Sequence, residues 1–138
     1  MSVMIKGVYK GKKRVELTHE QSGTAIITDA PLDNNGEGGS FSPTDLCASS
    51  LASCILTTMA IKAELSEMAD FSSAHFTCEK VMESNPRRIS LIKVSLHLPK
   101  SLDERSRKVL EAVGNACPVH HSLSDAVQKE IEYLYDVE

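Results

Sequence analysis

SPTDLCASSLASCILTTMAIKAEL, residues 42–65, is the longest stretch of the chain with almost no charge. It opens with Ser42, whose hydroxyl suits a helix N-cap, and with Pro43, which suits the first helical position. Asp45 completes an S-x-x-D capping pattern. Because the following residues are small or apolar at almost every position, the stretch predicts one long helix that is buried on nearly every side.

Two thiols, Cys47 and Cys54, are the ionisable side chains in the middle of this helix. Helical steps from Cys54 lead back to Leu51 and forward to Ile61, so its thiol lies on an apolar stripe. A thiol inside so apolar a segment needs a chemical explanation.

The bulk composition predicts one globular domain, residues 1–138. Hydrophobic residues make up 41% of the chain and aromatic residues only 4%, without tryptophan, so the core must come from aliphatic side chains and methionine. A net charge of −4 leaves no basic surface for nucleic acid or for an anionic membrane.

The distribution of apolar residues predicts a cytoplasmic protein. Residues 1–12 contain no sustained apolar run, so no secretory signal is expected. The apolar part of the central helix, residues 46–61, is shorter than the ~20 residues that a membrane-spanning helix needs. In a reducing compartment, the four cysteines are inert, metal-bound or redox-active rather than structural disulfides.

The segments before the central helix predict a short antiparallel meander. Residues 1–12, 14–19 and 24–28 carry strand patterns, with turns between them. Residues 29–40, DAPLDNNGEGGS, predict a loop that leads into Ser42.

The segments after the central helix predict a hairpin, a second helix and a last strand. The hairpin joins residues 69–83 to residues 87–98, whose alternate side chains form a nearly continuous apolar face. Residues 130–137, EIEYLYDV, alternate as the last strand.

The second helix is expected to begin at Ser101, which opens an S-x-x-E capping box with Glu104. Pro118 is expected to stop it. Its apolar face includes Leu110 and ends at Cys117. A second thiol is therefore predicted at the inward-facing end of this helix.

The order of elements contains no strand–helix–strand repeat, which favours an α+β fold with antiparallel sheets over a doubly wound fold. A helix that is apolar on all sides is awkward for one short chain with one sheet to cover it. Burying the helix between two copies of the chain solves this problem, so we expect an intimate homodimer.

The thiols are weighed first against the ordinary role of cysteine as a small buried hydrophobe. Cys47 and Cys78 fit that role. Cys54 and Cys117 differ because each lies on the apolar stripe of one of the two long helices, so packing of these helices would bring the thiols together. A peroxidatic thiol needs thiolate character, access for substrate and a second thiol that traps its sulfenic acid.

Burial raises the pKa of a cysteine, so a peroxidatic thiol needs a nearby cation. A guanidinium is suited to this task because it stays charged when desolvated. Spacing does not choose among the candidates, which are Arg14, Arg87, Arg88, Arg105 and Arg107.

The segment SFSPTDLCASSLASC, followed by ACPVHHSL, resembles the OsmC/Ohr family of osmotically inducible and organic hydroperoxide resistance proteins. The stretch RVELTHEQSGTAIITDAP resembles members of an OsmC-like branch, so the resemblance runs from about Arg14 to the end of the chain. It implies an intertwined homodimer that reduces organic hydroperoxides in oxidative stress defence. Cys54 matches the peroxidatic cysteine, Cys117 the resolving cysteine and Arg14 the activating arginine.

The resemblance implies no cofactor and no metal, and a lipoyl-type or small external dithiol as reductant. One position departs from the family pattern, in which a Pro-Glu pair starts the helix and the Glu orients the arginine. Here Pro43 is followed by Thr44, and Asp45 comes one place later, rotated by about 100° around the helix. Asp45 and Thr44 are the candidate orienting or capping residues.

Two other classes of function stay open from the residues alone. Cys117, His120 and His121, with Cys54 folded nearby, offer ligands that zinc accepts, although C-P-V-H-H matches no common zinc spacing. A non-catalytic module that binds an apolar or thiol-containing ligand is the second alternative, and the departure at Thr44 keeps it open.

Overall fold

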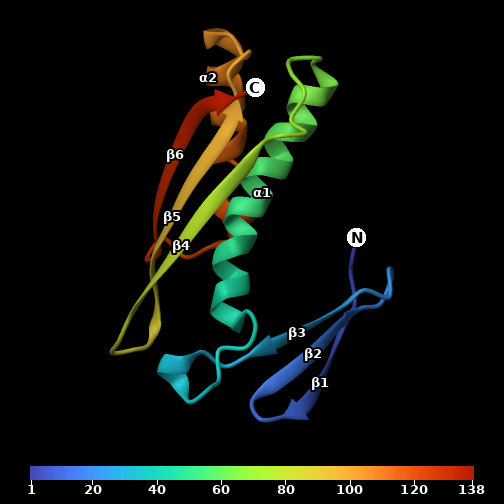
Figure 1. The fold of residues 1–138 in the computed structure, drawn as a ribbon, viewed down its shortest axis with the longest axis vertical. Coiled ribbons are helices and arrows are strands. Elements are labelled where there is room, and N and C mark those ends of the chain that lie inside the picture. Colours follow the sequence, from blue (N-terminus) through green and yellow to red (C-terminus); the bar gives the residue numbers. More distant parts are fainter. The chain divides into compact units, whose positions relative to one another are not determined.

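The computed structural model describes all 138 residues and divides into two compact units, Met1–Cys47 and Ala48–Glu138 (Figure 1). The long helix α1 (Pro43–Leu65) begins in the first unit and continues through the second. Its bounds agree with the helix predicted for residues 42–65. The organisation of the chain as one functional domain stays a prediction.

The first unit contains the predicted meander. Strands β1 (Ile5–Gly11), β2 (Arg14–His19) and β3 (Ala25–Asp29) pair antiparallel in the order β1-β2-β3. The following loop contains one short 3-10 helix, η1 (Leu32–Asn34), which the sequence did not predict.

The first unit has no apolar core of its own. Its buried side chains are polar, namely Thr28, Asp29 and Ser42. Large apolar side chains of the sheet are instead exposed, among them Ile5, Val8, Tyr9, Ile26 and Ile27. Because a sheet is stabilised by covering an apolar face, this sheet needs a covering surface that its own unit does not supply.

The second unit is built on a mixed sheet. Strands β4 (His75–Glu83) and β5 (Arg88–Pro99) form the predicted antiparallel hairpin. The last strand, β6 (Gln128–Val137), pairs parallel with β5. The predicted α+β class is confirmed, but the expectation of antiparallel pairing is wrong for β6, because β5, the connecting helices and β6 form one strand–helix–strand crossover.

The crossover contains two helices, α2 (Glu104–Asn115) and α3 (Pro118–Ser122). Both α1 and α2 lie against the same face of the sheet (Figure 1). The core between them comes from α1, from alternate positions of β5 and from the crossover, and consists of Ala48, Leu51, Ala52, Ile55, Met59, Ala63, Ile92, Val94, Leu96, Leu98, Leu102, Leu110 and Cys117.

Within the single chain, α1 buries only one stripe. Ser53, Thr57 and Ile61 follow one another at four-residue spacing and are exposed, with Ile61 54% exposed. The prediction that the helix is buried on nearly every side is therefore wrong for one chain alone. By length and composition α1 could also cross a membrane, but the core helix of a soluble protein meets the same criterion.

The two helix starts differ in how well the sequence predicted them. Ser42 and Asp45 form the expected reciprocal cap, in which each side chain accepts the backbone N–H of the other, at 2.8 and 3.1 Å. The start of α2 is capped by Asp103, whose Oδ1 accepts the N–H of Ser106 at 2.8 Å. The capping box predicted at Ser101 is wrong, and the N-cap lies two residues later, at Asp103.

Candidate functional site

Cys117 caps a helix instead of ending one. Helix α2 ends at Asn115, and Pro118 occupies the first turn of α3, where its missing N–H costs nothing. The Sγ of Cys117 accepts the backbone N–H of His120 at 3.4 Å. The prediction that Pro118 stops the second helix at Cys117 is thus corrected: the proline starts a new helix, and its N-cap is the thiol.

Cys54 and Cys117 are brought together in the second unit. Cys54 lies on α1 and is partly buried, whereas Cys117 is fully buried. The two thiols are near neighbours, because Cys54 is among the groups that raise the pKa of Cys117. Both thiols are free. The expectation that packing of the two helical segments would place these thiols side by side agrees with this arrangement.

Gly114 explains how α2 comes so close to α1. A Cβ atom at this position would lie 3.1 Å from Cγ2 of Ile55 and 3.2 Å from Sδ of Met59, both on α1. It would also lie 3.0 Å from the hydroxyl of Tyr133 on β6. Ile55 directly follows Cys54, and Gly114 lies three residues before Cys117. The close approach of the two helices at Gly114 therefore brings the two thiols near each other.

The buried thiol is held in its protonated form at neutral pH. Burial raises the pKa of Cys117, a hydrogen bond from the N–H of His120 lowers it, and Cys54 raises it again. Cys117 therefore has little thiolate character of its own, whereas a peroxidatic thiol needs it. This contrast suits Cys117 to the resolving step better than to the first attack on a peroxide.

Tyr133 lies near Cys117, and the sequence did not single it out. Burial raises its pKa to about 12, with further contributions from Glu111 and Cys117. Its hydroxyl donates to Oδ1 of Asn115 at 2.6 Å. The alternating pattern of the last strand indicated a strand, but nothing in it showed that one tyrosine would reach the end of α2.

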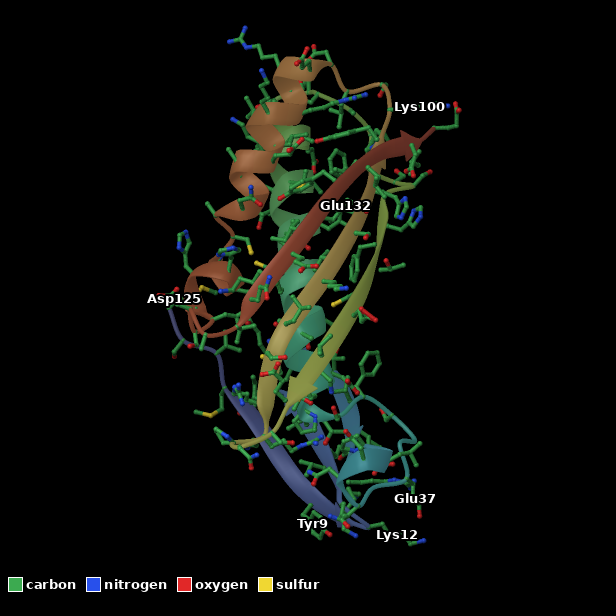
Figure 2. All side chains as sticks on the ribbon, turned by 90° about the vertical axis from the view of Figure 1, so that its left-hand side faces the viewer. Tyr9, Lys12, Glu37, Lys100, Asp125 and Glu132 are labelled. Atoms are coloured by element: carbon green, nitrogen blue, oxygen red, sulfur yellow. The ribbon has the colours of Figure 1, made fainter.

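Arg14 lies in the first unit, at the start of β2. Its Nε is 3.4 Å from Oδ2 of Asp29, and one terminal nitrogen is 3.0 Å from Oε2 of Glu37. Figure 2 shows Glu37 on the exterior of this unit. Neither carboxylate was predicted, because both pair with Arg14 across a loop or a strand register that spacing does not reveal. The approach of Arg14 to Cys54 stays a prediction.

Two of the other candidate arginines are engaged elsewhere in the second unit. The guanidinium of Arg88 donates to the carbonyl oxygens of Ser84 and Pro86 in the β4–β5 turn. Arg107 donates to the carbonyl of Leu102 and lies 4.2 Å from the ring centroid of Tyr135. These contacts hold a turn and a helix end in place.

Asp45 and Thr44 both take part in the start of α1. Asp45 completes the cap, and the hydroxyl of Thr44 is 3.1 Å from that of Ser42. Their capping role is thus visible, and an orienting role for either one stays a prediction.

The structure gives no reactive role to Cys78 and no metal-binding geometry to the histidines. Cys78 contacts the carbonyl of Ala48 at 3.7 Å, and burial raises its pKa, as expected for an inert packed thiol. His120 reaches Cys117 through its backbone N–H and not through its ring. No group of three or more histidine, cysteine or carboxylate side chains in the chain has a geometry that could hold a metal ion.

Comparisons with known proteins agree with this fold. The sequence profile of the OsmC-like protein family matches residues 36–132. A crystal structure from Psychrobacter arcticus 273-4, provisionally described as an osmotic stress induced and detoxification response protein, is 38% identical with a TM-score of 0.90 and covers 96% of each chain. A comparison with curated protein sequences gives no match.

More distant solved structures share the fold. An organic hydroperoxide resistance protein OsmC from Legionella pneumophila is 18% identical, with a TM-score of 0.72 and 97% of each chain covered. A protein from Vibrio cholerae, provisionally described as an organic hydroperoxide resistance protein and crystallised with captopril in one active site, is 14% identical, with a TM-score of 0.74 and 99% and 93% of the two chains covered. The chain belongs to the OsmC-like protein family.

Proposed function

We propose that this protein is a thiol peroxidase that reduces organic hydroperoxides to alcohols, with Cys54 as the peroxidatic and Cys117 as the resolving residue. The observation that carries the proposal is the proximity of these two free thiols, one partly buried and one fully buried. Membership of a family that includes organic hydroperoxide resistance proteins supports the substrate class.

The first chemical step is attack of the Cys54 thiolate on the distal oxygen of the hydroperoxide. A sulfur–oxygen bond forms, the oxygen–oxygen bond breaks, and the alkoxide takes a proton and leaves as an alcohol. The thiolate is oxidised by two electrons to a sulfenic acid, and the peroxide is reduced by the same two. A guanidinium stabilises both the thiolate and the departing oxygen, and Arg14 is the residue that we assign to this task.

The second step depends on the proximity of the two thiols. The sulfur of Cys117 attacks the sulfenic sulfur of Cys54, a disulfide forms, and water leaves with the thiol proton. An external dithiol then reduces the disulfide by thiol–disulfide exchange and is itself oxidised. Because Cys117 starts α3 directly after the end of α2, a short segment has to adjust when the bond forms.

A homodimer is part of this proposal. Large apolar side chains are exposed on the β1–β3 sheet, and Ile61 and Leu65 are exposed on α1. Two copies of the chain that cover each other's exposed faces would bury these side chains. We place the active unit in the cytoplasm, where cellular dithiols can reduce the disulfide.

Turnover of an organic hydroperoxide such as cumene hydroperoxide, with a dithiol as reductant, tests the proposal. We expect Cys54→Ser to reduce turnover to the rate without protein. Cys117→Ser should still consume one equivalent of peroxide and then accumulate a sulfenic acid that dimedone labels. Cys78→Ser is the matched control and should keep the wild-type rate, because its thiol packs against α1. Wild-type turnover by Cys54→Ser would refute the proposal.

The alternative of a non-catalytic binding module makes a different prediction for the same sample. A binder would keep all of its thiols after exposure to one equivalent of hydroperoxide, whereas the proposed enzyme loses two together. The bound captopril in the Vibrio cholerae structure supports a small-molecule site in such folds, and it fits both functions.

A further inference from the structure

We propose that Asp29 is the positioning residue for Arg14, a role that rests on the proposed function of Arg14. The two residues are direct register partners on β3 and β2. The Nε of Arg14 lies 3.4 Å from Oδ2 of Asp29, and the same oxygen accepts the backbone N–H of Gly39 at 2.9 Å. One carboxylate oxygen therefore links the arginine to a fixed point of the backbone.

Burial separates Asp29 from the other carboxylate near Arg14. The side chain of Asp29 is 0% exposed, whereas that of Glu37 is 68% exposed. An ion pair with an exposed partner is screened by water and holds a side chain weakly. A buried carboxylate, by contrast, costs free energy unless it is paired, so the pair with Asp29 is the one that restricts Arg14.

Asp29 is held as a carboxylate. The N–H of Gly39 lowers its pKa most, burial acts in the opposite direction, and Arg14 lowers the pKa further. Its second oxygen, Oδ1, is buried and has no hydrogen-bond partner. Buried oxygens are rarely left without a donor, so the arginine and the N–H of Gly39, which both contact Oδ2, are the groups that hold this carboxylate in place.

The backbone around the pair leaves no room for another side chain. A Cβ atom on Gly39 would lie 3.1 Å from Oδ2 of Asp29 and 3.4 Å from a terminal nitrogen of Arg14. Because Asp29 holds Nε, the terminal nitrogens remain for other acceptors, and one now contacts exposed Glu37. Thiolate or peroxide oxygen can replace that exchangeable contact without disturbing the Asp29 pair.

The test combines single-turnover kinetics with an NMR signal of the arginine. In the full-length protein, Asp29→Asn should slow oxidation of Cys54 by an organic hydroperoxide about 10- to 100-fold, the usual cost of a misplaced catalytic group. In an Arg14→Lys background, Asp29→Asn should slow the oxidation of Cys54 by less than about 2-fold, because lysine has no Nε–H to position. Asp33→Asn, a carboxylate-to-amide change at an exposed position of η1, is the control and should keep the wild-type rate.

The Nε–H signal of Arg14, assigned by its absence in Arg14→Lys, should be protected from exchange with water in the wild type. Asp29→Asn should remove this protection, and Glu37→Gln should keep it. If Asp29→Asn does not fold, Gly39→Ala crowds the pair with the carboxylate in place and should reduce the rate and the protection in the same way.

Equal losses in both arginine backgrounds, or an unchanged Nε–H signal in Asp29→Asn, would overturn the proposal. If the protein is not a peroxidase at all, the result is different. Cys54→Ser would then keep wild-type turnover, regardless of whether the Nε–H signal of Arg14 is protected.

Discussion

The protonation of Cys117 gives the most direct prediction at the scale of single residues. Burial raises its pKa, so the folded protein holds the thiol proton to higher pH than the unfolded chain does. Stability from this difference is present at neutral pH and declines as pH rises from the unfolded pKa through the folded one. We expect the alkylation rate of Cys117, followed by mass spectrometry, to reach its midpoint above the ordinary value of 9.0.

The control for this measurement is the same cysteine in urea, where the midpoint should return to the value of an ordinary thiol. A midpoint in the folded protein equal to or below that in urea would contradict the buried environment of Cys117.

The position of a functional residue was predictable from the sequence where a short local pattern indicated it. The apolar stripe around Cys54 and the thiol before Pro118 are both visible in short stretches, and the structure brings them together. Asp29 and Tyr133 were not predictable, because their partners lie across a strand register or at the end of another helix. A single sequence contains no signal for such pairs.

At the scale of elements, the start of α2 gives a prediction that separates the structure from the sequence pattern. Asp103, not Ser101, caps this helix, and the hydrogen bond from the N–H of Ser106 lowers the pKa of Asp103. We expect Asp103→Ala to lower the urea midpoint of unfolding at pH 7. Ser101→Ala, the matched control, should change the unfolding free energy by less than about 0.5 kcal/mol.

The sign of the pH dependence follows from the lowered pKa of Asp103. Its stabilisation is present above the unfolded value of ~3.9 and is lost as pH falls through the folded pKa. The difference between wild type and Asp103→Ala should therefore shrink in acid. A larger loss from Ser101→Ala than from Asp103→Ala would instead favour the capping box predicted from the sequence.

The elements that the sequence predicted well are those with strong periodicity and clear ends. Helix α1 and strand β5 are examples, and the cap formed by Ser42 and Asp45 is observed as expected. The direction of β6 was missed because alternation gives a strand but not its pairing. Pro118 was misread because proline suits a helix start as well as a helix end.

At the scale of the whole molecule, the exposed apolar side chains Ile61 and Leu65 of α1 predict self-association. Ile61 is 54% exposed although it lies in the most apolar helix of the chain. We expect sedimentation velocity to give twice the chain mass of 15.1 kDa. Ile61→Lys should shift the protein toward the monomer because it places a charge in the interface.

Ala112→Lys is the matched control, since Ala112 is also exposed on a helix of the same unit. It should leave the mass of the particle unchanged. A monomeric wild type at micromolar concentration, or equal effects of the two lysines, would show that this face of α1 is not the interface.

The dimer is a prediction from the sequence, because a helix with no charged side chain between Asp45 and Lys62 has to be covered. The sequence did not reveal how much one chain covers by itself. It also did not show that the β1–β3 sheet buries no apolar side chain. Composition gives the number of apolar residues, but only the packing of the folded chain determines which of them are buried within the same chain.

Mapping of the disulfide after one equivalent of organic hydroperoxide tests the central claim most directly. The reduced protein is mixed with the peroxide and quenched with an alkylating agent, and its peptides are then identified by mass spectrometry. We predict one disulfide, between Cys54 and Cys117, with Cys47 and Cys78 fully alkylated. A protein that keeps four free thiols, or one that forms its disulfide through Cys47 or Cys78, would contradict the account.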